Sequence, residues 1–234
     1  MFVPLYDDNP LRHVRAAFIT YTLIGLNVFV FLAFQSGLFG IEVEVTALRY
    51  GVIPAVLMDI EELAPEFVVI PEQLTLLTYM FLHGSWLHLI GNMLFLWVFG
   101  DNVEDATGHF RFLIFYLACG AFAALVHSIV LPDSELPLVG ASGAVAGVIA
   151  AYLMLHPRVR VWVLILYRIP VRLTAMWVLG VWVGIQLFNA LTVRGDGVAW
   201  WAHVGGLAAG ATLILFMRRP GVALFDKNLV RSGV

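Results

Sequence analysis

The sequence predicts an all-α, polytopic membrane protein built as a bundle of six transmembrane helices. Of its 234 residues, 61% are hydrophobic and 12% are charged, and the mean hydropathy is +0.91. Soluble domains carry about 25% charged residues, so this chain has about half the charge that a water-facing surface needs. Six charge-free stretches also approach the length of about 20 apolar residues that crosses the hydrocarbon layer of a membrane.

The same composition excludes other classes of protein. The net charge is −3 and no basic tract is present, which argues against a nucleic-acid-binding protein. The apolar content argues against a soluble globule and a disordered chain. The single cysteine, Cys119, excludes a disulfide scaffold and a cysteine-based zinc site.

The expected spans begin with residues 16–36. The apolar core of this stretch is longer than the core of a cleaved signal peptide, about 7–15 residues, and no A-x-A-like site follows it, so we interpret it as a retained anchor. The second stretch, 73–100, exceeds one crossing, and its early part around 74–81 is expected at the membrane interface. The other four spans are 112–132, 136–154, 173–193 and 198–217. The short apolar run 161–167 is expected in a loop or at the interface.

Basic residues gather on one side of these spans. Eleven of the 13 lysine and arginine residues lie before span one, between spans two and three, between spans four and five, or after span six. They are Arg12, Arg15, Arg111, Arg158, Arg160, Arg168, Arg172, Arg218, Arg219, Lys227 and Arg231. The other two, Arg49 and Arg194, lie on the opposite side. Because basic loops stay in the cytoplasm, both termini are expected there and the acidic first loop, 37–72, outside.

The predicted organisation is therefore a multi-pass integral membrane protein with one membrane domain. We expect a cytoplasmic N-terminal segment at 1–15, a six-span domain at 16–217 and a cytoplasmic C-terminal tail at 218–234. The compact six-span plan is typical of a bacterial inner (plasma) membrane, with an organelle membrane as the alternative.

Few polar residues lie inside the expected spans, where such groups are costly and mark function. His83, His88 and Asn92 lie in span two, Ser142 in span four and His203 in span six. All three spans enter the membrane from the outer face. At 1.5 Å per residue, Ser142 is expected about 9 Å along span four and His203 about 7–8 Å along span six. Their similar depth predicts a polar site in the outer half of the bilayer.

Small residues indicate how spans four and six meet. His203 and Gly206 share one face of span six, and Gly143 and Gly147 form a small-xxx-small pair beside Ser142. Such faces let membrane helices approach closely. A neutral imidazole within reach of a hydroxyl accepts its proton, so the pair is a candidate base and nucleophile. No Asp or Glu lies in the expected spans, which predicts a dyad rather than a Ser-His-Asp triad.

Span two also offers candidate oxyanion donors. His88 and Asn92 are four residues apart and share a helix face, and either side chain can donate to a developing negative charge. Ser142 itself lies near an expected helix start, where free backbone N–H groups and the helix dipole favour an anion.

Together these motifs resemble the rhomboid family of intramembrane serine proteases. The motifs are His83-x4-His88-x3-Asn92 in span two, Gly140-Ala141-Ser142-Gly143 in span four and Ala202-His203-x-Gly205-Gly206 in span six. A lone G-x-S-G is a weak signal, whereas three motifs in this order, each on the expected span, are specific. The resemblance covers residues 16–217.

The resemblance implies a six-helix rhomboid-like bundle with Ser142 as nucleophile and His203 as base. It implies an oxyanion hole formed by His88, Asn92 and the Ser142 backbone N–H, and cleavage without cofactor or metal. Supporting roles are expected for His83, Gly140, Gly143 and Gly206. For His83 we favour a structural bond to the first loop.

Two features depart from the family pattern. Many members carry an aromatic residue four positions after the serine, stacked on the catalytic histidine, and this position is Ala146 here. Trp200 or Trp201 is a candidate replacement. A Trp-Arg pair often found in the first loop is also missing, and Arg49-Tyr50 is a candidate to fill part of that space.

Each polar residue also has a structural interpretation. Ser142 can serve helix packing, His203 can bond a backbone carbonyl, and Asn92 can bridge helices. Zinc ligation by the histidines is disfavoured because no H-E-x-x-H motif is present. A proton transporter or channel that uses these histidines would need an acidic or basic partner for them within the spans, and the expected spans contain none.

The sequence therefore predicts a rhomboid-type serine endopeptidase that cleaves transmembrane segments near their extracytoplasmic end. Its expected partners are single-span or other transmembrane protein substrates and the lipid bilayer, with no nucleic acid, metal or cofactor. The alternative is a catalytically silent rhomboid-like protein that binds membrane proteins in quality control. Span five or the loop at 194–199 is the expected gate.

Overall fold

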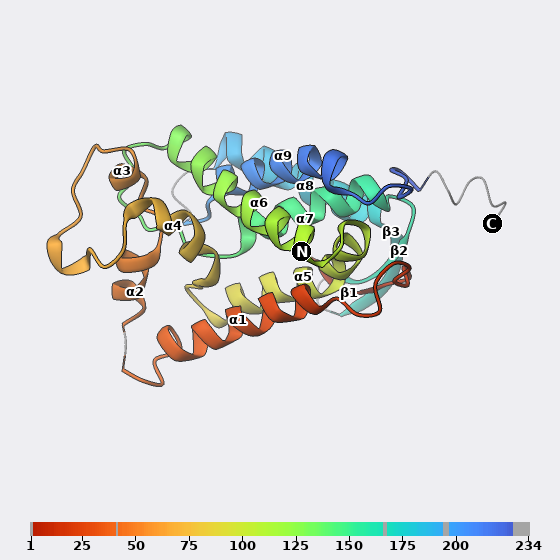
Figure 1. Ribbon diagram of the computed structural model, residues 1–234, viewed down its shortest axis with the longest axis horizontal. Coiled ribbons are helices and arrows are strands. Elements are labelled where there is room, and N and C mark those ends of the chain that lie inside the picture. Colours follow the sequence, from red (N-terminus) through yellow and green to blue (C-terminus); the bar gives the residue numbers. More distant parts are fainter. Residues whose placement is uncertain (1, 41, 166–167, 194–196, 227–234) are drawn as a thin grey trace.

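Long helices dominate the computed structural model, which describes residues 2–40, 42–165, 168–193 and 197–226. The long helices are α1 (Phe18–Phe34), α5 (Trp86–Thr107), α6 (His109–Val130), α7 (Ser142–Leu155), α8 (Ala175–Thr192) and α9 (Trp200–Met217). The short helices are α2 (Val43–Tyr50), α3 (Pro54–Leu57) and α4 (Glu72–Thr78), with 3₁₀ turns at Pro65–Phe67 and Tyr79–Phe81. The strands are β1 (Phe2–Asp7), β2 (Arg160–Ile165) and β3 (Ile169–Thr174). The short helices α2–α4 lie at one end of the long axis and the sheet at the other, with the long helices between them (Figure 1).

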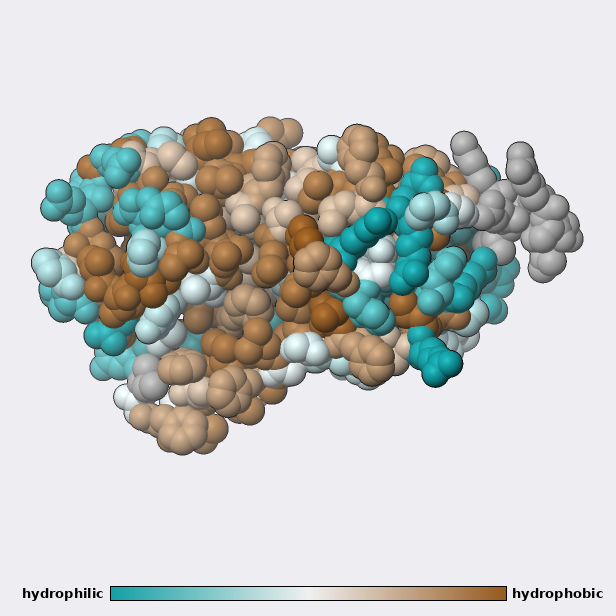
Figure 2. All heavy atoms as spheres, viewed as in Figure 1, coloured by the Kyte–Doolittle hydropathy of each residue, from teal (hydrophilic) through white to brown (hydrophobic). Residues whose placement is uncertain are grey.

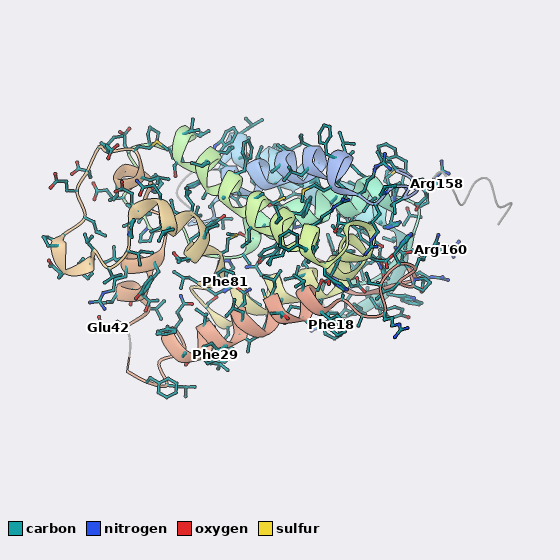
Figure 3. All side chains as sticks on the ribbon, viewed as in Figure 1. Phe18, Phe29, Glu42, Phe81, Arg158 and Arg160 are labelled. Atoms are coloured by element: carbon teal, nitrogen blue, oxygen red, sulfur yellow. The ribbon has the colours of Figure 1, made fainter. Side chains whose placement is uncertain are left out.

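Several long helices have the length and apolar composition of membrane spans. Among the described residues, α6, α8 and α9 each qualify, and α4 with its 3₁₀ turn and α5 form a fourth, bent candidate. Helices α1 and α7 are apolar but shorter, with 17 and 14 residues. On the face shown in Figure 2, hydrophobic residues cover the middle of the molecule and hydrophilic ones gather toward its ends. On α1, Phe18 and Phe29 point away from the bundle and are 62% and 64% exposed (Figure 3). These features are those of a polytopic helical membrane protein, while the count of six spans stays a prediction.

Helix α7 lies at the buried centre of the bundle. Eleven of its 14 residues are buried, and most of them are small. A Cβ added to Gly206 of α9 would lie 1.9 Å from the carbonyl oxygen of Gly143, and one added to Gly210 would lie 2.1 Å from that of Gly147. The two backbones are therefore in direct contact, as small residues permit between membrane helices.

The second expected span, 73–100, differs from the observed helices at both ends. Its early part forms α4 and a 3₁₀ turn, which meet α5 at an angle of 83°. Helix α5 begins after Ser85, whose hydroxyl accepts a hydrogen bond from the backbone N–H of His88 at 3.2 Å. It then continues beyond Gly100 to Thr107.

This longer α5 contains Asp101, Glu104 and Asp105, which follow the expected second span, 73–100. Glu104 is fully buried, and a buried carboxylate is tolerated only when it is bonded. Its oxygens accept hydrogen bonds from the backbone N–H groups of Ile19 and Thr20, at 3.0 and 2.7 Å. The carboxylate thus satisfies the free donors at the start of α1.

The apolar run 161–167, expected in a loop or at the interface, is not a loop in its described part, because residues up to Ile165 form strand β2. Strand β2 is the centre of an antiparallel sheet ordered β1-β2-β3. In this sheet Phe2 pairs with Ile165 and Arg160 pairs with Thr174. The expected N-terminal segment 1–15 supplies β1, and the tail 218–234 is described only to residue 226.

Replacing Gly210 with alanine is expected to destabilise the bundle by about 1–3 kcal/mol, because α7 and α9 must move apart to admit the new methyl group. Thermal unfolding in detergent measures this loss. Gly184→Ala is the matched control on α8, where no atom lies within 4 Å of the added Cβ. Equal losses of stability in the two variants would contradict close packing as the cause.

Candidate active site

Ser142 is the first residue of α7, not a residue about 9 Å along a helix as the expected span 136–154 required. The preceding segment is extended and pairs with the first loop, where Leu138 and Val52 exchange backbone hydrogen bonds of 2.7 and 3.1 Å. The backbone N–H of Gly140 donates to the carbonyl oxygen of Tyr79 at 2.9 Å. These bonds fix the point at which α7 starts, and they leave the Ser142 hydroxyl at a helix N-terminus. Its backbone N–H is among the first of the helix, which have no partner within the helix.

His203 lies beside Ser142 in the first turn of α9. Its Nε2 is 2.9 Å from the Ser142 Oγ, and His203 is 9% exposed whereas Ser142 is partly exposed. Because α9 starts at Trp200, His203 is only about 4–5 Å from the helix start, less than the expected depth. The contact depends on the close approach of α7 and α9 through Gly143 and Gly206.

The other ring nitrogen of His203 contacts a residue that the sequence analysis missed. Nδ1 lies 2.8 Å from the Oε1 of Gln186, which is 4% exposed on α8. The sequence analysis considered only Asp or Glu as a third residue beside Ser142 and His203, and so did not consider the amide of Gln186. Its position as a polar residue in the apolar stretch 173–193 was the sequence feature that could have indicated a role for Gln186.

Two tryptophan rings also flank His203. The ring centroid of Trp200 is 5.8 Å away at an interplanar angle of 88°, and that of Trp182 is 6.2 Å away at 33°. Trp200 was one of two expected replacements for the missing aromatic, while Trp182 was not foreseen. Ala146 is fully buried in a small apolar cluster against which Trp182 packs.

His88 and Asn92 converge on the segment before Ser142. A Cβ added to Gly140 would lie 2.6 Å from the Nε2 of His88 and 3.8 Å from the Nδ2 of Asn92. Gly140 also has a φ of +123°, so glycine is required there for both backbone conformation and space. The Asn92 Nδ2 is buried and has no hydrogen-bond partner among the described residues. A hydrogen-bond donor without a partner thus lies beside the segment that leads into Ser142.

His83 lies next to His88 and is fully buried. Its backbone N–H donates to the side-chain oxygen of Gln35, just after α1, at 2.8 Å. Its ring packs edge-on against that of His88, with 5.1 Å between centroids. His83 therefore borders the site from the side of α1. The expected bond from His83 to the first loop, 37–72, is not formed with any described residue of that loop, because the partner of its backbone N–H is Gln35 and its ring nitrogens have no partner there.

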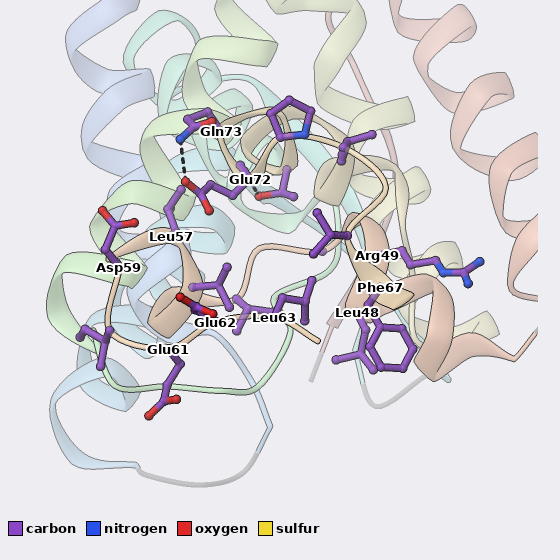
Figure 4. A pocket seen from close by; sticks show the side chains of 18 residues that line it. Leu48, Arg49, Leu57, Asp59, Glu61, Glu62, Leu63, Phe67, Glu72 and Gln73 are labelled. Atoms are coloured by element: carbon purple, nitrogen blue, oxygen red, sulfur yellow. Dashed lines mark hydrogen bonds between the residues drawn. The ribbon is translucent and has the colours of Figure 1, made fainter. Parts of the chain in front are cut away.

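A cavity of about 640 Å³ lies apart from Ser142, within the first loop and the start of α4 (Figure 4). Its lining combines apolar residues with Arg49 and the carboxylates of Asp59, Glu61, Glu62 and Glu72. Among the described residues, no group of three or more His, Cys, Asp or Glu side chains is arranged to hold a metal ion.

The chain matches a family model described as the Rhomboid domain over residues 71–220. It belongs to the rhomboid family. The match covers α4 to α9. It therefore includes the helices that carry His88, Asn92, Ser142, Gln186 and His203.

Curated rhomboid relatives occur in plants and bacteria. RHOMBOID-like protein 5 of Arabidopsis thaliana is 31% identical over 69% of this chain and 50% of its own length. Rhomboid protease GluP of Bacillus subtilis (strain 168) is 30% identical over 67% of this chain and 28% of its own length. Rhomboid-like protein 11, chloroplastic, of Arabidopsis thaliana is 45% identical over 31% of this chain and 26% of its own length. The chain thus spans about a quarter to a half of the length of these relatives.

Proposed function

We propose that this rhomboid is an intramembrane serine endopeptidase. The observation that carries the proposal is the 2.9 Å contact between the Ser142 Oγ and the His203 Nε2. The pair lies among apolar helices that have the composition of membrane spans. A nucleophile and base within hydrogen-bond reach, with the base held by a third group, is the arrangement expected for acyl transfer. One relative is itself named a rhomboid protease, which supports the same activity.

The chemistry would proceed through an acyl-enzyme. His203 takes the proton of Ser142 as its Oγ attacks the peptide carbonyl, and the protonated imidazole then gives the proton to the leaving amine. Water, activated by the same imidazole, releases the acid product and restores the hydroxyl. The negative charge on the carbonyl oxygen would be stabilised by His88, Asn92 and the Ser142 backbone N–H. The buried, unpartnered Nδ2 of Asn92 supports its share in this role.

The proposed substrates are transmembrane segments, cut near their extracytoplasmic end. A helical peptide bond has its carbonyl engaged in an i→i−4 hydrogen bond, so the segment must unwind before attack. Substrates with helix-destabilising residues and a small residue before the scissile bond are therefore favoured. Helix α8 is the proposed gate, because only four of its 18 residues are buried. Of the alternative gate at 194–199, residues 194–196 lie outside the described part of the chain.

The charge distribution supports a topology with both termini in the cytoplasm. Glu42 lies at the end of the molecule formed by the first loop, whereas Arg158 and Arg160 lie at the opposite end with the sheet (Figure 3). Basic residues are retained on the cytoplasmic side, so the sheet would face the cytoplasm and the first loop the exterior. Because the start of α7 pairs with the first loop, Ser142 would be reached by water from outside.

The alternative function is a silent rhomboid-like protein that binds membrane proteins without cutting them. Such a protein has no need of a serine hydroxyl bonded to an imidazole. The presence of both groups in contact therefore favours the protease.

Ser142→Ala and His203→Ala are each expected to lower the cleavage of a single-span test substrate in detergent by at least about 1,000-fold, because each removes one half of the dyad. The measurement is the initial rate of product formation, with unfolding temperature as the check on folding. Cleavage at wild-type rate by both variants would reject the dyad. A folded wild type that cleaves no substrate would favour the silent alternative.

Asn92→Leu is expected to lower kcat by about 100- to 1,000-fold with little change in KM, because a donor to the oxyanion acts mainly in the transition state. Steady-state kinetics on the same substrate separate the two constants. Asn189→Leu on α8 is the control for removal of an amide from a membrane helix. A change confined to KM would contradict an oxyanion role for Asn92.

A cysteine introduced at Glu61 is expected to react with a membrane-impermeant maleimide added outside the cell, and one introduced at Arg158 only after permeabilisation. Both positions are exposed, and the native Cys119 is fully buried and gives little background. The reverse labelling pattern would overturn the proposed topology.

A further inference from the structure

The imidazole of His203 contacts a second polar side chain besides Ser142. Its Nδ1 lies 2.8 Å from the Oε1 of Gln186 on α8, while its Nε2 faces the Ser142 Oγ on α7. Gln186 is one of four buried residues on α8, and the other three are Ala175, Val178 and Leu179. An amide buried in an apolar bundle costs free energy unless it is bonded, and here the bonded partner is the imidazole of the proposed base.

The backbone carbonyl oxygen of Trp182 fixes the donor and acceptor roles in the hydrogen bonds that run from Gln186 through His203 to Ser142. The Nε2 of Gln186 donates to the backbone carbonyl oxygen of Trp182 at 3.1 Å, and a carbonyl oxygen only accepts. Gln186 must therefore turn its own carbonyl oxygen toward His203. Because that oxygen also only accepts, the proton of a neutral His203 lies on Nδ1. The lone pair of Nε2 then faces the Ser142 hydroxyl, as proton abstraction requires.

We propose that Gln186 is a positioning residue that holds His203 in the tautomer able to accept the Ser142 proton. This inference rests on the proposed protease function. In a Ser-His-Asp triad the carboxylate performs this task and also stabilises the imidazolium. An amide fixes the tautomer and the ring orientation without placing a charge in the apolar bundle, where ionised carboxylates are costly.

The flanking aromatic rings cannot perform this task. Trp182 and Trp200 lie against the imidazole and limit its tilt. A ring contact does not distinguish Nδ1–H from Nε2–H, whereas a hydrogen-bond acceptor at 2.8 Å from Nδ1 does. Tautomer selection is therefore assigned to Gln186 and packing of the ring to the tryptophans.

The rival explanation is that Gln186 only satisfies its own buried amide and stabilises the fold. Methionine distinguishes the two roles because it is a flexible, unbranched side chain of similar length without a strong acceptor. Glutamate retains an oxygen that accepts from Nδ1–H. Asn189→Leu is the matched control, since it removes an amide from α8 one turn beyond Gln186.

Gln186→Met is expected to lower kcat/KM by about 10- to 100-fold, mainly through kcat, because a buried Nδ1–H loses its acceptor. Gln186→Glu is expected to recover activity to within about tenfold of wild type, since an ionised carboxylate accepts the same bond. Its charge also favours the imidazolium, so the acidic limb of the pH profile moves to higher pH. Among the described residues, the other titratable groups near enough to affect the charge of His203 are His88 on α5 and His127 on α6, and both are unchanged in these variants. Asn189→Leu leaves the acceptor of the His203 Nδ1 in place, so the acidic limb of its pH profile is expected to stay where it is in wild type.

Nitrogen-15 NMR of the histidine rings in detergent reads the tautomer without turnover. The signal of His203 is assigned by its loss in His203→Ala. Wild type is expected to show a protonated Nδ1 and an unprotonated Nε2, and Gln186→Met a mixture of the two tautomers. A wild-type His203 protonated on Nε2 would overturn the inference, whether or not the methionine variant folds.

The kinetic results separate this inference from the proposed function. Cleavage that requires Ser142 but is unchanged in Gln186→Met overturns the positioning role and leaves the protease intact. Cleavage that persists in Ser142→Ala overturns the proposed function itself. A stability loss in Gln186→Met without any change in tautomer or kcat would leave Gln186 with a purely structural role.

Discussion

The contact between the backbones of α7 and α9 is the constraint on which the proposed site depends. Gly206 and Gly210 lie so close to the carbonyl oxygens of Gly143 and Gly147 that no side chain fits between them. In a bilayer, where lipid is as apolar as the helices, such close packing is a main source of helix association. It also places the first turns of both helices side by side, and those turns carry Ser142 and His203. The same glycines therefore serve both the stability of the bundle and the geometry of its polar pair.

Several polar side chains that are buried in this bundle are bonded across helices. Glu104 is bonded to the start of α1, and Gln186 links His203 to a helix carbonyl. The Nδ2 of Asn92 is one of several buried side-chain atoms without a hydrogen-bond partner among the described residues, and it lies beside the segment that leads into Ser142. A donor left without a partner is costly to the folded state, and that cost is recovered when a substrate oxygen binds there.

Hydropathy and motif spacing predicted the helical membrane class and pointed to the residues that the structure brings together around Ser142. They did so because span length and the cost of buried polar groups are properties of local sequence. The sheet was missed because β2 reads as a short apolar run whose pairing with β1 depends on residues far away in the chain. The extension of α5 was missed because the bonds that neutralise Glu104 come from α1. Gln186 was missed for the same reason, since its role depends on how α8 packs against α9 and not on any motif of its own.

The most direct test of the central claim is reaction of the folded protein in detergent with a fluorophosphonate, followed by peptide mass spectrometry to locate the phosphonyl group. A serine hydroxyl activated by an adjacent imidazole reacts with such a reagent, whereas a serine that only packs helices does not. The expected result is one adduct, on Ser142, which forms in wild type and is lost in His203→Ala. Absence of an adduct from the folded wild type, or labelling of Ser142 that does not require His203, would contradict the assignment of these two residues as nucleophile and base.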